Sequence, residues 1–474
     1  MRNHLYTWVI CTLFSLLIVS PMSAQALRGS YFAENATLRH RLNPAMMPDN
    51  GYLGLPVIGN TGVGVNSNLG LNNFLFPQNG QLLSFMHPDV SADDFLSALP
   101  VDPFLDVEFD TDLLSVGFYS SKNAFWTVDL SLRAMADTRL PYDLFAFAKQ
   151  GMNQLPQSYT LRDFTLQEDL YAQVSVGYAR DLSNLVEGLR VGAKAKLLLG
   201  VERIDLRINK ADITLSQDAW LVNTDAVGLV MGKGIRLPEN QDAEFEMPEI
   251  GDLGIGGFGY AFDLGAEYEF NLGIPILDGL RLSASLTDLG NISYSEDNVQ
   301  QLVSAGSFAY EGFPDLTLDS YDFEAAFDQI ADEFMALANF RETGLTESTS
   351  YSTDPRLYLG AEYPFLNNSM SVGVLYYSRF RPSRTESEVT FSYNYRPNEW
   401  LAAGVNYSFL NQAKSIGWLL EFTPKRGVNF FLGSDYTYLE FSPQFLPIER
   451  FCMNMRFGLT LSFANRFAKA ADKD

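Results

Sequence analysis

Few residues of this chain have the side-chain chemistry that catalysis needs. The histidines are His4, His40 and His87, and neither they nor Cys11 and Cys452 stand at a spacing that binds zinc. His40 would serve a serine hydrolase only if a serine and an acidic or amide side chain converged on it, and the sequence has no Gly-x-Ser-x-Gly elbow. With 57 acidic residues, neighbouring carboxylates carry no information about glycosidase chemistry. The sequence therefore predicts no catalytic residue, no metal site and no cofactor.

Alternation with a period of two residues dominates the chain instead. In its last such run, residues 453–463, the apolar residues Phe457, Leu459, Leu461 and Phe463 alternate with polar or small ones. A strand of an outer-membrane barrel needs this pattern, because one face touches lipid while the other lines a wet lumen. We expect these four residues to form the assembly signal, which meets outer-membrane lipid and the barrel assembly machinery.

The same pattern recurs along the chain and predicts an all-β fold, a transmembrane antiparallel up-and-down β-barrel of about 14 strands. A helix over these segments would have mixed faces. The alternation does not separate 14 strands from 16. The predicted strands are 55–65, 112–120, 125–136, 170–180, 189 to past 208, 258–270, 280–287, 355–365, 370–380, 388–396, 400–409, 415–423, 428–440 and 453–463.

Connection lengths alternate between long and short, as in barrels with long outer loops and short periplasmic turns. The long connections are 66–111, 137–169, 216–256 and 290–354. This parity holds only if residues 189–215 form one long strand, and it places both termini in the periplasm. We expect short helices in the long loops, after Ser91, at 142–152 and at 322–339. The last is acidic and amphipathic, and it either caps the barrel mouth, docks a partner or gates a ligand.

The N-terminus and the composition agree with an outer membrane of a Gram-negative cell. An apolar run over residues 8–19, followed by small residues, predicts a signal peptide over 1–26, cleaved near Ala24 or Ala26. After the signal peptide, the sequence is predicted to divide into a periplasmic or plug segment at 27–50, the barrel at 51–463 and a periplasmic tail at 464–474. A net charge of −24 argues against nucleic acid as a partner.

Residues 39–48 of the N-terminal segment are predicted to plug the lumen. They include Arg39, His40, Arg41 and Asn43, whose polar groups would meet side chains of the inner wall. By alternation the lumen-facing groups are the carboxylates Asp263, Glu267, Glu269, Glu362 and Glu388 and the cations Lys194, Lys196, Arg281, Arg356, Arg396 and Arg456. Both signs in one lumen favour a closed, salt-bridged interior over an open ion pore. Alternatively, Arg39 and Arg41 pair only at the periplasmic rim.

Three stretches resemble a family of Bacteroidota outer-membrane barrels of unknown function. They are RHRLNPA at 39–45, GYLGLPVIGN at 51–60 and NSNLGLNNFLFP at 66–77. More distantly, the architecture and the SLTDLG stretch at 285–290 are similar to the long-chain fatty-acid transporter (FadL) superfamily, whose 14-stranded barrel is plugged by its N-terminal segment. That resemblance implies passage of hydrophobic or amphiphilic small molecules and assigns no site residue.

Three functions follow from these patterns. A transporter would carry a hydrophobic small-molecule ligand past the plug and would have an apolar pocket under its outer loops. A non-transporting scaffold would have a filled lumen and would bind a surface partner protein or secretion machinery. A barrel enzyme would need His40 beside a serine or a bound metal.

Overall fold

The computed structural model describes most of the chain after the predicted signal peptide. The described residues are 27–463 except 35, 79–80, 151–156, 216–219, 237–248, 272, 275–277, 305–306, 311–339, 346, 383, 399, 411–413, 426 and 438–449. Three predicted elements lie outside them: the signal peptide at 1–26, the acidic helix at 322–339 and the tail at 464–474.

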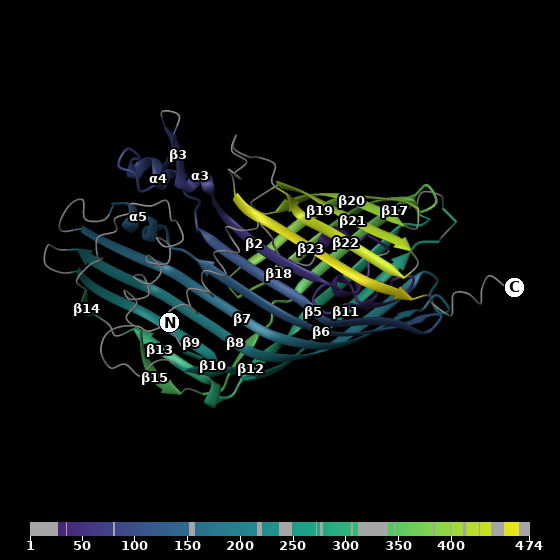
Figure 1. The fold of residues 1–474 in the computed structure, drawn as a ribbon, viewed down its shortest axis with the longest axis horizontal. Helices are drawn as coiled ribbons and strands as arrows, with labels where there is room; N and C mark the ends of the chain where they lie inside the picture. Colours follow the sequence, from purple (N-terminus) through teal and green to yellow (C-terminus); the bar gives the residue numbers. More distant parts are fainter. Residues whose placement is uncertain are drawn as a thin grey trace.

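The chain forms a closed 14-strand antiparallel β-barrel, which confirms the predicted fold class (Figure 1). The first barrel strand, split into β1 (Gly51–Gly54) and β2 (Thr61–Gly70), pairs on one side with β5 and on the other with the last strand, β23. The remaining wall strands are β5 (Phe104–Ser121), β6 (Ala124–Arg139), β7 (Gln157–Asp181), β8 (Leu189–Leu215), β11 (Gly257–Glu269), β12 (Arg281–Tyr294), β17 (Arg356–Phe365), β18 (Met370–Phe380), β19 (Thr385–Asn398), β20 (Leu401–Leu410), β21 (Lys414–Lys425), β22 (Val428–Thr437) and β23 (Arg450–Phe463).

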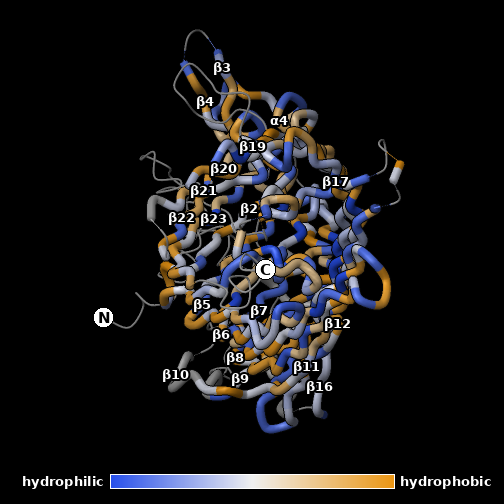
Figure 2. Tube along the Cα trace, turned by 90° about the vertical axis from the view of Figure 1, so that its right-hand side faces the viewer, coloured by the Kyte–Doolittle hydropathy of each residue, from blue (hydrophilic) through white to orange (hydrophobic). Residues whose placement is uncertain are grey.

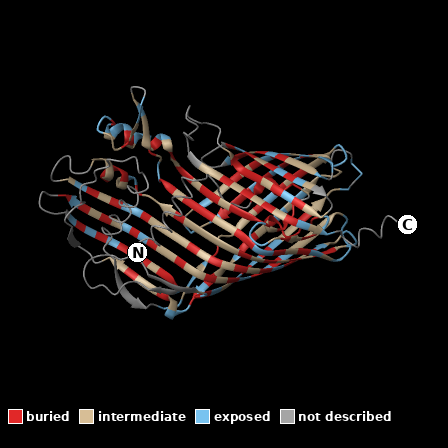
Figure 3. Ribbon diagram, in the orientation of Figure 1, coloured by how far each residue is buried: buried red, intermediate tan, exposed pale blue. Residues whose placement is uncertain are grey.

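Side chains alternate across the wall as a lipid-embedded barrel requires. On β11, Phe262 and Leu264 are about half exposed on the outside, whereas Asp263 between them is buried in the lumen. On β23, Leu461 and Phe463 are exposed and Thr460 is buried. Figure 3 shows this alternation of buried and exposed residues, and Figure 2 shows apolar and polar residues alternating along the same strands. Among the described residues, no helix is long and apolar enough to cross a membrane.

The predicted strand at 55–65 is wrong in its first half. Gly54 pairs with Thr460 and Thr61 pairs with Phe457, so residues 55–60 face only two residues of β23. They leave the ladder as a bulge, in which Val57 has a positive φ of 64°. Pro56 has no backbone N–H for the ladder, which explains why the strand breaks there.

At the end of the barrel that carries the long connections, several strands continue beyond the closed wall. The prediction that residues 189–215 are one strand is confirmed: the first half of β8 pairs with β11 and the second half with β9 (Trp220–Arg236). The segments predicted as loops at 66–111, 216–256 and 290–354 contain further strands, which correct that prediction. Besides β9, these are β3 (Leu75–Gln78), β4 (Gln81–Ser84), β10 (Glu249–Gly254), β13 (Val299–Ser304), β14 (Ser307–Tyr310), β15 (Phe340–Leu345) and β16 (Thr349–Ser352).

Short helices lie at the end of the barrel that carries the long connections. The predicted helices after Ser91 and at 142–152 are confirmed as α4 (Ala92–Ala98) and α5 (Tyr142–Gln150). The Ser91 hydroxyl accepts a hydrogen bond from the Asp94 amide at 3.0 Å, which caps α4. The other short helices are α3 (Leu71–Phe74) and the 3₁₀ turn η2 (Glu296–Asn298). Phe95 and Phe145 of these helices belong to one buried apolar cluster with Phe85.

Candidate functional site

The N-terminal segment lies inside the barrel and is not part of its sheet. It contains the 3₁₀ turn η1 (Arg28–Ser30) and the one-turn helix α2 (Arg39–Leu42), and most of its residues from Leu27 to Met46 are buried. Apolar contacts hold it against the wall: Tyr31 and Leu42 pack on Tyr358 of β17, and Leu27 packs on Phe431 of β22. We call residues 27–50 the plug.

Two glycines of the wall allow the plug backbone to approach closely. Gly192 of β8 and Gly265 of β11 are paired in register. A Cβ atom at Gly192 would overlap the carbonyl of Pro44, and one at Gly265 would lie 3.0 Å from Asn43 Cγ. Asn43 is fully buried there, and its amide donates to the carbonyl of Ala266 at 3.2 Å. The plug is therefore fitted to this part of the wall.

The two predicted arginines of the plug pair with carboxylates inside the lumen. Arg41 donates to Asp112 and lies 3.6 Å from Asp110, both on β5. Arg39 lies 3.8 Å from Glu267 on β11 and donates through Nε to the carbonyl of Tyr31 at 2.9 Å. Both side chains are largely buried, so the pairs lie in the lumen rather than at a solvated rim.

His40 joins the plug to a buried polar network on the wall. Lys194 donates to its Nδ1 at 2.9 Å, and Tyr52 lies 2.6 Å from its Nε2. Lys194 also donates to Asp129 at 2.9 Å, which in turn accepts from Ser115 at 2.7 Å. Burial, and next the charge of Lys194, hold the pKa of His40 well below its usual 6.5. His40 is therefore a neutral hydrogen-bonding group in this network.

The other predicted lumen residues form pairs around the plug. Lys196 lies 2.6 Å from Asp263, and Arg190 lies 2.8 Å from Glu267. Arg281 contacts Glu34 of the plug, Glu269 at 3.1 Å and Glu362 at 3.6 Å. Arg356 lies farther along the lumen, 3.9 Å from Glu108 and 3.8 Å from Asp288. No contact of Arg356 with the plug occurs among these pairs.

The predicted assembly residues lie on β23. Phe457 and Leu459 are partly buried, whereas Leu461 and Phe463 are exposed on the outside of the wall. Phe463 pairs in register with Gly51, at the point where the last strand meets the first.

Sequence reasoning missed two groups of charged residues, of which it had placed only Glu388 in the lumen. Arg28 lies 3.4 Å from Glu388, and the amides of Arg28 and Gly29 donate to Asp435 at 2.7 Å each. A second group surrounds the β18–β19 turn, where Arg381 lies 2.6 Å from Asp137. Its members are Arg379, Arg381, Arg384, Asp106, Glu108, Asp137, Asp354 and Glu386. The run RFRPSR at 379–384 was the available signal, but only the fold shows what it meets.

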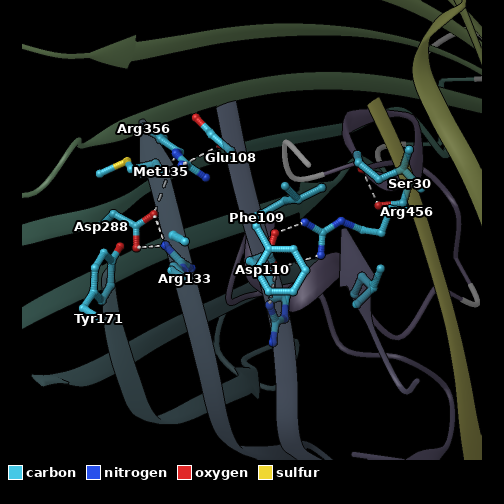
Figure 4. Close-up of a pocket in the computed structure, with 15 residues that line it drawn as sticks. Ser30, Glu108, Phe109, Asp110, Arg133, Met135, Tyr171, Asp288, Arg356 and Arg456 are labelled. Atoms are coloured by element: carbon cyan, nitrogen blue, oxygen red, sulfur yellow. Dashed lines mark hydrogen bonds and ion pairs between the residues drawn. The ribbon is translucent and has the colours of Figure 1, made fainter. Parts of the chain in front are cut away.

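Two cavities lie on different sides of the plug. The first, about 660 Å³ including space open to solvent, lies beside Leu38, Arg41 and Leu42 toward the long loops. Its wall is charged, with Arg133 and Arg356 around Asp288 and Arg456 on Asp110, as Figure 4 shows. The second, about 440 Å³ on the same measure, lies between the plug and β17–β21, next to the short turn at 366–369.

Comparison with known proteins gives a family and a set of similar folds. The family model described as a family of unknown function (DUF5723) matches residues 44–435. No curated protein matches the sequence.

Solved barrels cover nearly the whole chain at low identity. The toluene transporter TbuX of Ralstonia pickettii is 9% identical, with a TM-score of 0.42 over 91% of this chain and 95% of its own. The toluene transporter TodX of P. putida is 9% identical, with a TM-score of 0.42 over 94% of this chain and 99% of its own. A Pseudomonas aeruginosa FadL homologue is 10% identical, with a TM-score of 0.45 over 94% of this chain and 99% of its own.

Proposed function

The chain belongs to the DUF5723 family, and we propose that it is an outer-membrane barrel that takes up small amphiphilic molecules past a displaceable N-terminal plug. The observation that carries this proposal is the position of the plug between two cavities. The cavity toward the long loops and the cavity toward the short turns are both lined by plug residues, among them Leu42 and Phe32 respectively. Movement of the plug would join them.

The way in which the plug is held supports its displacement. Its elements η1 and α2 make no strand pairing with the wall, so it is able to move without breaking the barrel ladder. The contacts that hold it are side-chain ion pairs, such as Arg41 with Asp112, hydrogen bonds, such as those from the amides of Arg28 and Gly29 to Asp435, and apolar contacts. When the plug leaves, water can solvate the charged and polar groups that it releases. A ladder hydrogen bond broken inside a membrane has no water to replace it.

The lining of the lumen indicates the class of substrate. Apolar side chains gather where the strands project beyond the barrel: Leu161, Ile213 and Val222 belong to one buried cluster with Phe147 of α5. The cavity beside the plug is charged, in contrast to the apolar pocket that the sequence led us to expect of a transporter. An apolar body with a polar or charged head matches both regions better than a pure hydrocarbon does.

A reversible crosslink tests whether the plug must move. The Cβ built at Gly265 lies 3.0 Å from Asn43 Cγ, and in a disulfide the Cβ of one cysteine lies about 3 Å from the Sγ of the other. The double substitution Asn43→Cys and Gly265→Cys, with Cys452→Ser, should therefore fix the plug to β11 when oxidised.

The readout is uptake of radiolabelled octanoate by Gram-negative cells that carry the barrel in the outer membrane. Oxidised cells should lose at least ten-fold in initial rate relative to the same cells after reduction, which are the matched control. Equal rates in the two states would overturn plug-gated uptake.

A scaffold without transport is the second candidate function. The observation that favours it is the density of ion pairs in the described lumen, together with the strands that project beyond the barrel. In that case the projecting part of β8 and β9 would bind a surface partner protein. Octanoate uptake at the level of cells without the barrel, in both redox states, would favour the scaffold.

A further inference from the structure

We propose that the cavity between the plug and β17–β21 binds a small organic ammonium ion, with Glu421 of β21 as its counter-charge. This cavity is the second of the two described above. The site goes beyond the proposed uptake function and does not depend on movement of the plug.

Glu421 is a buried carboxylate that the protein itself leaves unsatisfied. Its side chain faces the lumen and is only 3% exposed. Within the part of the chain that the structure describes, neither carboxylate oxygen has a hydrogen-bond partner, and the residue lines the cavity. Burial of an ionised carboxylate without a hydrogen-bond partner is strongly unfavourable, so a donor or a cation is expected beside it.

The other acidic residues of the cavity already have partners. Glu34 of the plug contacts Arg281 and lies 2.7 Å from Arg396, and Glu362 lies 3.6 Å from Arg281. The cavity lining therefore carries three carboxylates, Glu34, Glu362 and Glu421, against one lining arginine, Arg396. Arg39 and Arg396 act on Glu421 through their charges, but neither donates a hydrogen bond to its carboxylate within the described part of the chain.

The space beside Glu421 suits a compact ligand. Ala402 is its partner in register on β20, and Gly404 follows two residues later, so neither fills the lumen next to the carboxylate. Phe32, Pro364 and Leu419 add apolar surface to the same cavity. An ammonium group on a short hydrocarbon body would pair with Glu421 and cover this surface.

A divalent metal ion is the weaker match. Calcium takes six to eight oxygen ligands, whereas in the described residues no group of three or more His, Cys, Asp or Glu is arranged to hold a metal. An ammonium group needs a charged partner and a few acceptors, and one unpaired carboxylate supplies these.

The test is isothermal titration calorimetry on the purified barrel in detergent, with n-butylammonium chloride as the probe. Binding should weaken at least ten-fold in Glu421→Gln and stay unchanged in Glu187→Gln, a matched loss of one charge at an exposed turn. Neither n-butanol nor butanoate should bind. Ala402→Leu keeps the carboxylate but fills the space, so it should weaken binding as well.

The contrary outcomes are clear. Absence of n-butylammonium binding to the wild-type barrel, as expected if Glu421 holds a proton instead, would overturn the proposal. Equal binding to wild type and Glu421→Gln, or binding of n-butanol as tight as that of the ammonium ion, would overturn it too. None of these results bears on octanoate uptake, so the two proposals fail separately.

Discussion

Lys194 donates a hydrogen bond to Nδ1 of His40 across 2.9 Å, from the wall strand β8 to the plug. A lysine ammonium has no acceptor, so His40 must accept at Nδ1 and carry its proton on Nε2, which donates to the Tyr52 oxygen 2.6 Å away. The same ammonium also neutralises Asp129. The docked plug thus requires a neutral histidine next to a permanent positive charge.

The first prediction is that the plug loosens in acid. Because the pKa of His40 is lowered by burial and by Lys194, the docked plug takes up no proton there near pH 6.5, whereas the released plug does. Docking should be fully stable above about pH 6.5 and should weaken as the pH falls below it. The protection factors of the amides at residues 39–45 against hydrogen exchange, which correct for the intrinsic pH dependence of exchange, should fall between pH 7.5 and pH 5.

His40→Gln should remove this pH dependence, because glutamine does not titrate. His87→Asn is the matched control, since His87 lies in the outer turn after β4 and should leave the dependence intact. Persistence of the full pH effect in His40→Gln would assign it to another group.

The second prediction concerns the ion pair of Arg41 with Asp112. Arg41→Met leaves the buried Asp112 and its neighbour Asp110 with less positive charge, and the loss of one partner of a buried pair costs about 3–5 kcal/mol. We expect trypsin to cleave the plug after Arg39 at least ten-fold faster than in the wild type. Arg356→Met is the control, because Arg356 pairs with Glu108 and Asp288 of the wall. Cleavage at the wild-type rate in Arg41→Met would show that this pair does not hold the plug.

The third prediction uses the close approach at Gly192. Gly192→Val would place a side chain into the backbone of Pro44, so the plug should be displaced while the barrel stays closed. Planar-bilayer recordings should then show larger or more frequent channel openings. Ala193→Val adds the same bulk one residue along, on the exposed face of β8, and should behave as the wild type. Silent recordings from Gly192→Val would mean that the lumen stays shut without a docked plug.

The fourth prediction tests the assembly signal. Phe463 is exposed on the lipid side of the last strand, opposite Gly51 of the first. If this aromatic guides assembly, Phe463→Ala should slow conversion to the folded, heat-modifiable form on gels several-fold. Phe430→Ala, a comparable exposed aromatic on β22, should have a smaller effect. Equal slowing by both would reduce the role of Phe463 to ordinary lipid contact.

Patterns that repeat within one strand were readable from the sequence. Alternation is a local consequence of the pleat, so it identified the barrel, the lipid face of β23 and the lumen side of residues such as Asp263 and Glu267. The alternation of long and short connections along the chain identified β8 as one long strand. The helix cap at Ser91 was also readable, because it depends only on residues within one turn of the helix. The break at Pro56 was missed because a bulge needs information about both neighbouring strands.

The sequence by itself determined that this chain closes into a β-barrel with both signs of charge in its lumen. Only the tertiary structure decided which charged groups meet: Arg41 with Asp112, His40 with Lys194, and Glu421 without a hydrogen-bond partner among the described residues. The reason is physical, because barrel closure and strand register fix the height and direction of every lumen side chain. These are properties of fourteen strands together, and no single strand carries them.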